Sequence, residues 1–582
     1  MTATVDETAR PGGHPETPGS AAPGGHPETP GSAAPSSQPE TSRSAAPGSG
    51  PETPDGLRKT PRTELPEFEP SVAGSAESGT PASGSAESEP AASGSTRIDA
   101  ERLALCIAVI AEAEELEPEH PDAVALRRAT AGLFKAVKMR RRRDRRDAIL
   151  ANDRAVTAAT ATGAPSRIDD ETAGLPLSTA TTDGIAGVLK QARGCYVCKQ
   201  RYTQVDAFYH QLCPRCAAEN HARRDARTDL TGRRALLTGG RAKIGMYIAL
   251  RLLRDGAHTT ITTRFPNDAV RRFAAMPDSA DWLHRLRVVG IDLRDPAQVV
   301  ALADSVAARG PLDILINNAA QTVRRSPGSY AALVTAESAP LPNGPLPELE
   351  YLGGHNPSPH PQALTGGELD TGADGTGPDA GGTSMFSPHA LTALALTGGS
   401  ASPDRIAALS AVDAGGLVPD LAPTNSWSDR VHEVEPLELL EVQLCNVTAP
   451  FILVSRLRAA MTRSSFPRRY VVNVSAMEGV FQRGYKGAGH PHTNMAKASL
   501  NMLTRTSAED MFTDGILMTS VDTGWITDER PHPTKMRLAD EGFHAPLDLV
   551  DGAARVYDPI VRGEQGEDLY GCFLKDYAPI AW

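Results

Sequence analysis

The sequence predicts an α/β fold with a doubly wound parallel sheet, and three observations lead to that prediction. From about residue 228, apolar strand-like runs alternate with helical segments. A glycine turn, Thr238-Gly239 to Gly245, follows the first run. Polar residues stand where later runs end, and the ends of parallel strands meet at one edge of a sheet. We therefore expect one α/β domain over residues 228–582.

The glycine turn predicts a dinucleotide site. Residues 234–245 have the pattern of an apolar strand, a tight turn and the start of a helix. Small residues there let backbone amides at the helix N-terminus approach a pyrophosphate. A glycine turn alone is a weak signal, but the strands that follow it strengthen the prediction.

The residue after the second strand bears on the choice of cofactor. Further strands are expected over residues 258–263, 286–291 and 312–316. The first of these ends at Arg264, with no Asp or Glu to hydrogen-bond a ribose 2′-hydroxyl. A guanidinium suits a 2′-phosphate, and Arg241 in the turn adds a second cation. We expect NADP(H) rather than NAD(H).

Residues 231–582, apart from about 335–425, resemble the short-chain dehydrogenase/reductase family. The resemblance rests on the turn at Thr238, Asn317-Asn318-Ala319, Asn446, Lys497 and Val521 to Trp525. It implies a Rossmann-type fold, a nicotinamide cofactor, a small carbonyl or alcohol substrate and a homo-oligomer. The cofactor-binding residues that it implies, together with the two arginines, are Thr238, Gly239, Arg241, Gly245, Arg264, Asp292, Asn318, Ala319, Lys497 and Gly524.

Three positions depart from the family pattern. The middle glycine of the turn is Lys243, the tyrosine position is Thr493, and the serine position is Ala476, with Ser475 one place early. A threonine hydroxyl cannot be tuned to exchange a proton near neutral pH as a lysine-assisted phenol can. The candidate catalytic residues are Lys497, Asn446, Thr493, Ser475 and Tyr485, and His490 and His492 flank the tyrosine position.

Two functions therefore stay open. One is an NADP(H)-dependent oxidoreductase with an atypical active site. The other is a catalytically silent NADP(H)-binding scaffold or sensor that engages a partner through a metal module and a basic helix.

The metal module is predicted by four cysteines, Cys195, Cys198, Cys213 and Cys216. They form two CxxC pairs with fourteen residues between them. Two such knuckles complete a tetrahedral, structural zinc site. A redox dithiol would need a thioredoxin-like strand–helix context, which this segment lacks. We expect a zinc module over residues 191–227.

The chain before this module divides into three parts. Residues 1–96 hold 16 of the 47 prolines and one aromatic residue, Phe68, so we expect a disordered tail. Residues 97–160 have helical periodicity and include the basic run Arg140 to Arg146, a possible protein or nucleic-acid contact. Residues 161–190 have the composition of a linker. The glycine-rich segment at about 335–425 is expected to be a flexible insertion.

Composition limits the partners and the cellular compartment that we expect for this chain. A net charge of −12 argues against nucleic-acid binding over the whole surface. The longest apolar run, residues 103–111, is shorter than the roughly 18 residues of a membrane span. Seven cysteines, four of them at metal spacing, indicate a reducing compartment. We expect a cytoplasmic protein without a membrane partner.

Overall fold

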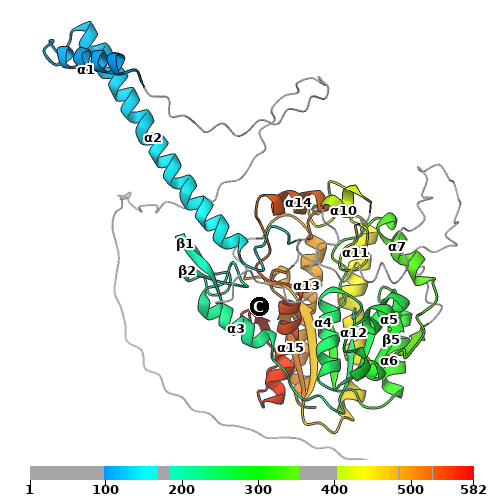
Figure 1. Ribbon diagram of the computed structural model, residues 1–582. Coiled ribbons are helices and arrows are strands. Elements are labelled where there is room, and N and C mark those ends of the chain that lie inside the picture. The colour runs from blue at the N-terminus through cyan, green and yellow to red at the C-terminus, as the bar shows by residue number, and fades with distance from the viewer. Residues whose placement is uncertain (1–97, 168–183, 353–402, 410, 483–485, 527–528) are drawn as a thin grey trace, which may run out of the picture. The chain divides into compact units, whose positions relative to one another are not determined.

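The computed structural model describes residues 98–167, 184–352, 403–409, 411–482, 486–526 and 529–582 (Figure 1). All but Ile98 belong to one unit, Asp99–Trp582. The expected tail at 1–96, the candidate Tyr485 and the glycine-rich stretch 353–402 lie outside the described residues.

A nine-stranded sheet forms the centre of the unit. Its order is β11-β10-β9-β8-β6-β3-β4-β5-β7. All neighbours are parallel except β10 and β11. This confirms the predicted α/β fold. The strands are β3 (Arg234–Leu237), β4 (His258–Thr263), β5 (Leu286–Gly290), β6 (Ile314–Asn317), β7 (Glu348–Tyr351), β8 (Arg469–Ser475), β9 (Ile516–Asp522), β10 (Phe573–Lys575) and β11 (Ala578–Ile580).

Helices cover both faces of this sheet (Figure 1). One apolar cluster joins the sheet to α4 (Lys243–Arg254), α5 (Pro266–Ala274) and α15 (Leu549–Glu564). A second joins it to α6 (Pro296–Ala308), α12 (Ala449–Thr462) and α13 (Pro491–Phe512). The described residues of this region also form α7 (Pro327–Glu337), α10 (Pro403–Ala407), α11 (Pro436–Gln443), the π-helical turn Leu444–Thr448 and α14 (His532–Asp540).

The run Pro436–Thr462 is long and apolar enough to cross a membrane by length and composition. Half of its apolar window is buried, and Leu453, Leu457 and Met461 belong to the second apolar cluster. We therefore assign it as a core helix of the α/β fold.

The expected insertion at 335–425 is narrower than the sequence suggested. Strand β7 pairs in parallel with β5 at the sheet edge. Glu350 on β7 forms an ion pair with Arg287 on β5. Val412 and Asp413, beyond the undescribed stretch, are buried. Apolar periodicity missed β7 because glutamates held by arginine replace the usual apolar residues.

The N-terminal elements of the unit begin with α1 (Ala100–Glu114) and α2 (Pro121–Ala158), in the segment expected to be helical. The end of α2 contacts β1 (Ile185–Gly194), where Asp153 accepts hydrogen bonds from the amides of Lys190, at 2.7 Å, and Gln191. β1 pairs with β2 (Arg201–Asp206), and α3 (Pro214–Arg224) follows.

The expected linker at 161–190 is wrong at both ends. β1 already occupies residues from Ile185 onward. At the other end Thr162 and Arg167 are buried, and Arg167 donates to the carbonyl of Ala545 at 2.7 Å. Small and polar residues there are held by side chain–backbone hydrogen bonds that composition does not reveal.

Candidate functional site

A cavity of about 400 Å³ opens at the carboxyl ends of β3, β4, β5 and β6. Seven of the ten predicted cofactor residues line it, namely Gly239, Arg241, Gly245, Arg264, Asp292, Asn318 and Ala319. Thr238, Lys497 and Gly524 are not among its lining residues. We call this cavity the cleft.

Two of the three glycines in the turn, Gly239 and Gly245, lie so close to neighbouring backbone atoms that a side chain would clash. Gly239 has φ +70°, and a Cβ there would lie 2.9 Å from Cα of Ala319. A Cβ at Gly245 would lie 2.0 Å from the carbonyl oxygen of Gly239. α4 follows, and its N-cap Ala242 has no side-chain oxygen for the first-turn amides. A ligand anion fits that position.

Hydrogen bonds of the side chains of Thr238 and Asn318 hold the glycine turn against the end of β6. The hydroxyl of Thr238 accepts from the amides of Asn318 and Ala319, each at 3.0 Å. Nδ2 of Asn318 donates to the carbonyls of Thr238 and Gly239, at 3.0 and 3.1 Å. These two side chains fix the turn against β6 and hold the glycines at the cleft.

Lys243, in the family's glycine position, has a backbone that favours glycine. Its φ is +52°, in the left-handed region. Its ammonium lies 3.6 Å from Oδ2 of the buried Asp413. Burial would raise the pKa of Asp413, but the charges of Lys243 and Arg325 outweigh burial and hold that pKa well below its usual range.

The two predicted phosphate-binding arginines flank one aromatic ring. The guanidinium carbons of Arg241 and Arg264 lie 5.4 and 5.7 Å from the ring centre of Phe265. Arg241 forms an ion pair with Asp268 and donates to the carbonyl of Gly415 at 2.8 Å. Arg264 lies 5.3 Å from the ring centre of Tyr330, which also lines the cleft. Both guanidinium groups line the cleft, so both are candidates to bind an anionic group.

Asp292, one of the cofactor-binding residues that the family resemblance implies, is ion-paired with Arg294 at 2.7 Å. Burial raises the pKa of Asp292, but Arg294 outweighs burial and lowers it. The carboxylate is therefore ionised where it lines the cleft.

Lys497 and Asn446 bind backbone groups near the cleft. Nζ of Lys497 donates to the carbonyl of Val474 at 2.9 Å, and burial lowers the pKa of Lys497 to about 8. Asn446, in the π-helical turn, accepts from the amide of Gln321 at 2.7 Å and donates to its carbonyl at 2.9 Å. Gln321 lines the cleft, so Asn446 positions part of its wall.

The candidate proton donors differ in what they contact. The hydroxyl of Ser475 donates to Oδ1 of Asn501 at 2.6 Å. The hydroxyl of Thr493 is buried and has no hydrogen-bond partner among the residues that the structure describes. The same holds for both ring nitrogens of His492, whose pKa burial lowers. Among the candidate proton donors that the structure describes, Thr493 and His492 are thus the two whose buried polar atoms have no hydrogen-bond partner.

Sequence reasoning missed several cleft residues, which are Gln321, Arg325, Tyr330, Gly415, Leu417, Glu529 and Leu549. They come from loops and helix starts outside the recognised motifs, and no local pattern distinguishes them. Asp413, which pairs with Lys243, follows the glycine-rich stretch and carries no motif either.

The four cysteines form one cluster. Their Sγ atoms all lie within 4.8 Å of one another, and those of Cys198 and Cys213 are 3.6 Å apart. Zinc–sulfur bonds of about 2.3 Å in a tetrahedron place sulfurs about 3.8 Å apart, so the cluster fits zinc. The neighbouring histidines have other partners: His210 contacts Thr162, and His221 contacts Asp206.

Comparisons with known proteins support the resemblance to short-chain dehydrogenases for part of the chain. Residues 233–333 match the model of the family described as short chain dehydrogenase. An uncharacterized protein of Acanthamoeba polyphaga mimivirus is 29% identical over 386 residues, 63% of this chain and 71% of that protein. A probable oxidoreductase of Streptomyces antibioticus is 44% identical over 94 residues, and the match covers 16% of this chain and 30% of that protein.

Among solved structures, a short chain dehydrogenase from Burkholderia cenocepacia in complex with NADP is 18% identical to this chain. That comparison covers 60% of this chain and 97% of the other, with a TM-score of 0.36. The fold assignment rests instead on the strand order and the helices packed on both faces of the sheet.

Proposed function

We propose that this chain is an NADP(H)-dependent oxidoreductase of the short-chain dehydrogenase type, acting on a carbonyl or alcohol. One observation carries the proposal. The cleft lies where parallel strands end, and the glycine turn and the start of α4 line it within the segment that matches the family model. Dinucleotides bind at this place in doubly wound sheets.

The preference for NADP(H) rests on Arg264. Its guanidinium lines the cleft at the end of β4, packed on Tyr330 and Phe265. A delocalised guanidinium binds phosphate with directed hydrogen bonds and stacks on aromatic rings. The residue after the second strand is where a dinucleotide's 2′ position is recognised.

When bound, reduced nicotinamide supplies a hydride to a carbonyl carbon, and the carbonyl oxygen then needs a proton. Lys497 would hold the ribose, as the family resemblance implies. Thr493 and His492 are buried without partners among the described residues, whereas Ser475 already donates to Asn501. An imidazole exchanges protons far more readily than an aliphatic hydroxyl, so His492 is the stronger proton-exchanging group of the pair, although burial lowers its pKa and favours its neutral form.

We further propose that the cysteine cluster holds one structural zinc ion per chain. Two observations support this proposal. The four sulfur atoms lie within 4.8 Å of one another, and among the described residues the cluster consists of cysteines alone, which is typical of structural zinc sites. Such a site needs reduced thiols, which is consistent with a cytoplasmic protein.

The test combines binding with turnover. Calorimetry with NADPH and NADH should show tighter binding of NADPH, and a panel of carbonyl compounds should reveal NADPH oxidation followed by absorbance. NADPH binding without turnover on any panel member would support the catalytically silent scaffold instead. No binding of either nucleotide would refute both.

A further inference from the structure

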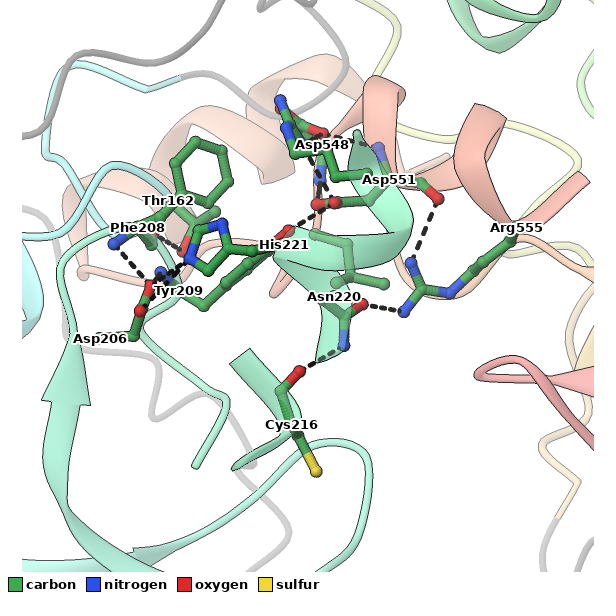
Figure 2. A network of polar contacts seen from close by, with 12 residues as sticks. Thr162, Asp206, Phe208, Tyr209, Cys216, Asn220, His221, Asp548, Asp551 and Arg555 are labelled. Carbon is green, nitrogen blue, oxygen red and sulfur yellow. Dashed lines mark hydrogen bonds and ion pairs between the residues drawn. The ribbon is translucent and has the colours of Figure 1, made fainter. Parts of the chain in front are cut away.

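The cysteine module is tied to the first turn of α15, which forms a wall of the cleft. Arg224, the last residue of α3, contacts both oxygens of Asp548 at 2.7 Å and one oxygen of Asp551 at 3.0 Å. The hydroxyl of Tyr209 donates to the same oxygen of Asp551 at 2.6 Å (Figure 2). Both carboxylates are fully buried.

Asp548 and Asp551 are also the capping box of α15. The side chain of Asp548 accepts from the amide of Asp551 at 2.9 Å, and that of Asp551 accepts from the amide of Asp548 at 3.1 Å. Without Arg224, two acidic groups would be buried side by side, which is unfavourable. The start of α15 therefore depends on α3.

A second connection begins at a cysteine of the cluster. Nδ2 of Asn220 donates to the carbonyl of Cys216 at 2.7 Å, and Oδ1 of Asn220 accepts from Arg555 of α15 at 2.9 Å (Figure 2). Asn220 and Arg555 are both buried. Two hydrogen bonds thus link the backbone of Cys216 to the second turn of α15.

The module also holds the chain that precedes α15. The hydroxyl of Tyr196, between Cys195 and Cys198, accepts from the amide of Trp525 at 2.9 Å. Leu547 and Leu549 belong to the same apolar cluster as three of the cysteines. The metal-binding knuckle and the chain after β9 therefore share one core.

This shared core reaches the cleft. Leu549 lines the cleft, and so does Ile244 of the glycine turn. Ile244 packs on the module's apolar cluster. A Cβ built at Gly552 would lie 3.3 Å from Cδ1 of Ile244, so α15 is packed directly against the turn. A shift of α15 would move the wall beside the pyrophosphate position.

We propose that the cysteine module is a positioning element for the cleft, with Arg224 as its main positioning residue. Metal at the four cysteines holds α3, α3 holds the capping box of α15, and α15 holds Leu549 against Ile244. Metal binding and cofactor binding then stabilise each other, because coupling between two sites is reciprocal. Only the part of this inference that concerns cofactor binding rests on the proposed function. The part that concerns the position of α15 does not.

Two measurements on the full chain test the two halves separately. Hydrogen exchange of residues 544–556, compared with and without a zinc chelator, needs no cofactor. We expect faster exchange there after zinc removal, while the sheet strands stay protected. Unchanged exchange at 544–556 would overturn the inference, whatever the cofactor does.

The second measurement is zinc release to a coloured chelator, with and without saturating NADPH. NADPH should slow release, and the zinc affinity measured by competition with the chelator should rise by about 5–150-fold, the usual range of coupling between sites. If NADPH binds but release is unaffected, the inference fails and the proposed function stands. If NADPH does not bind, the proposed function fails and the exchange measurement alone decides.

Single substitutions test whether Arg224 carries the connection between the module and the cleft. Arg224→Gln should weaken NADPH binding and remove the effect of NADPH on zinc release, and Arg224→Lys should restore part of both by keeping the charge. The matched control is Arg227→Gln. Arg227 pairs with buried Asp255, at the end of α4 away from the cleft. Equal NADPH affinity in Arg224→Gln and Arg227→Gln would contradict the role of Arg224. Should Arg224→Gln fail to fold, Arg224→Lys is compared with Arg227→Gln in its place.

Discussion

The ammonium of Lys243 lies 3.6 Å from a carboxylate oxygen of Asp413, 170 residues further along the chain. The pair joins the glycine turn to the segment that follows the glycine-rich stretch. Lys243 keeps a backbone conformation that disfavours side chains, and such strain persists at sites where a side chain has a role.

Lys243→Gly should separate strain from function. Glycine accepts a positive φ, which removes the usual penalty of about 1 kcal/mol for a left-handed residue, but the buried carboxylate of Asp413 loses its Lys243 partner, so stability against urea should fall overall. NADPH affinity should fall because a cation at the cleft is lost. The control is Leu409→Gly, at an exposed residue with φ +54° outside the cleft and the cysteine module. It should leave NADPH affinity unchanged, and an equal loss of affinity there would show that Lys243 has no special role.

Arg264→Gln should weaken NADPH binding by about 1–3 kcal/mol, the scale of a charge-assisted hydrogen bond, and change NADH binding little. Arg505→Gln is the control, since Arg505 is exposed on α13. Calorimetry with both nucleotides checks this. A native protein with equal affinity for NADPH and NADH would be inconsistent with the preference inferred from Arg264.

Thr493→Val tests whether the buried hydroxyl of Thr493 serves the fold or the reaction. The hydroxyl has no partner among the described residues, so its removal should cost no stability. Thr504→Val is the control, because Thr504 accepts from Asn473 at 2.9 Å and contacts Ser520. That variant should lose about 1–3 kcal/mol. Turnover lost in a stable Thr493→Val would identify a catalytic hydroxyl.

Lys497 should make the free energy of unfolding depend on pH. Its pKa is about 8 in the folded protein, against 10.5 for an ordinary lysine. Between these values the unfolded chain binds more protons, so this group makes stability rise with pH. The unfolding free energy of the native protein relative to Lys497→Met should increase across that window and level off above it. A flat difference would mean that Lys497 is not desolvated.

Gly245→Ala should disrupt the turn, because the added methyl would meet the carbonyl oxygen of Gly239 at 2.0 Å. We expect loss of NADPH binding together with a lower melting temperature. Gly328→Ala, in α7 with open space around it, should be neutral or stabilising by about 0.4–1 kcal/mol. Comparable melting temperatures for the two variants would contradict the geometry of the turn.

The sequence predicted the central sheet well because its inner strands carry contiguous β-branched and apolar residues, as in Thr259 to Thr263. The same reasoning failed for β7, whose glutamates form ion pairs with Arg287 on β5 and with Arg309, which directly follows α6. Strand propensity and apolar periodicity reveal strands that are buried. An edge strand that is held by ion pairs has no apolar pattern to detect.

The site was predictable only where a motif marks backbone geometry. Gly239 and Gly245 stand out because a side chain would clash. Leu549 and Asp413 are placed by tertiary packing, which single-sequence patterns do not encode. The junction of Arg224 with Asp548 likewise depends on folding across 324 residues of chain.

That separation has a consequence for biosynthesis. At about 5–20 residues per second, Asp548 leaves the ribosome roughly 16–65 s after Arg224. During that interval the cysteine module can fold around its metal, but Arg224 and Tyr209 have no acidic partners. The nascent module thus exposes a cationic, aromatic surface that only the arrival of α15 conceals. Delayed translation between these two segments would lengthen the time in which that surface is open to the wrong acidic chain.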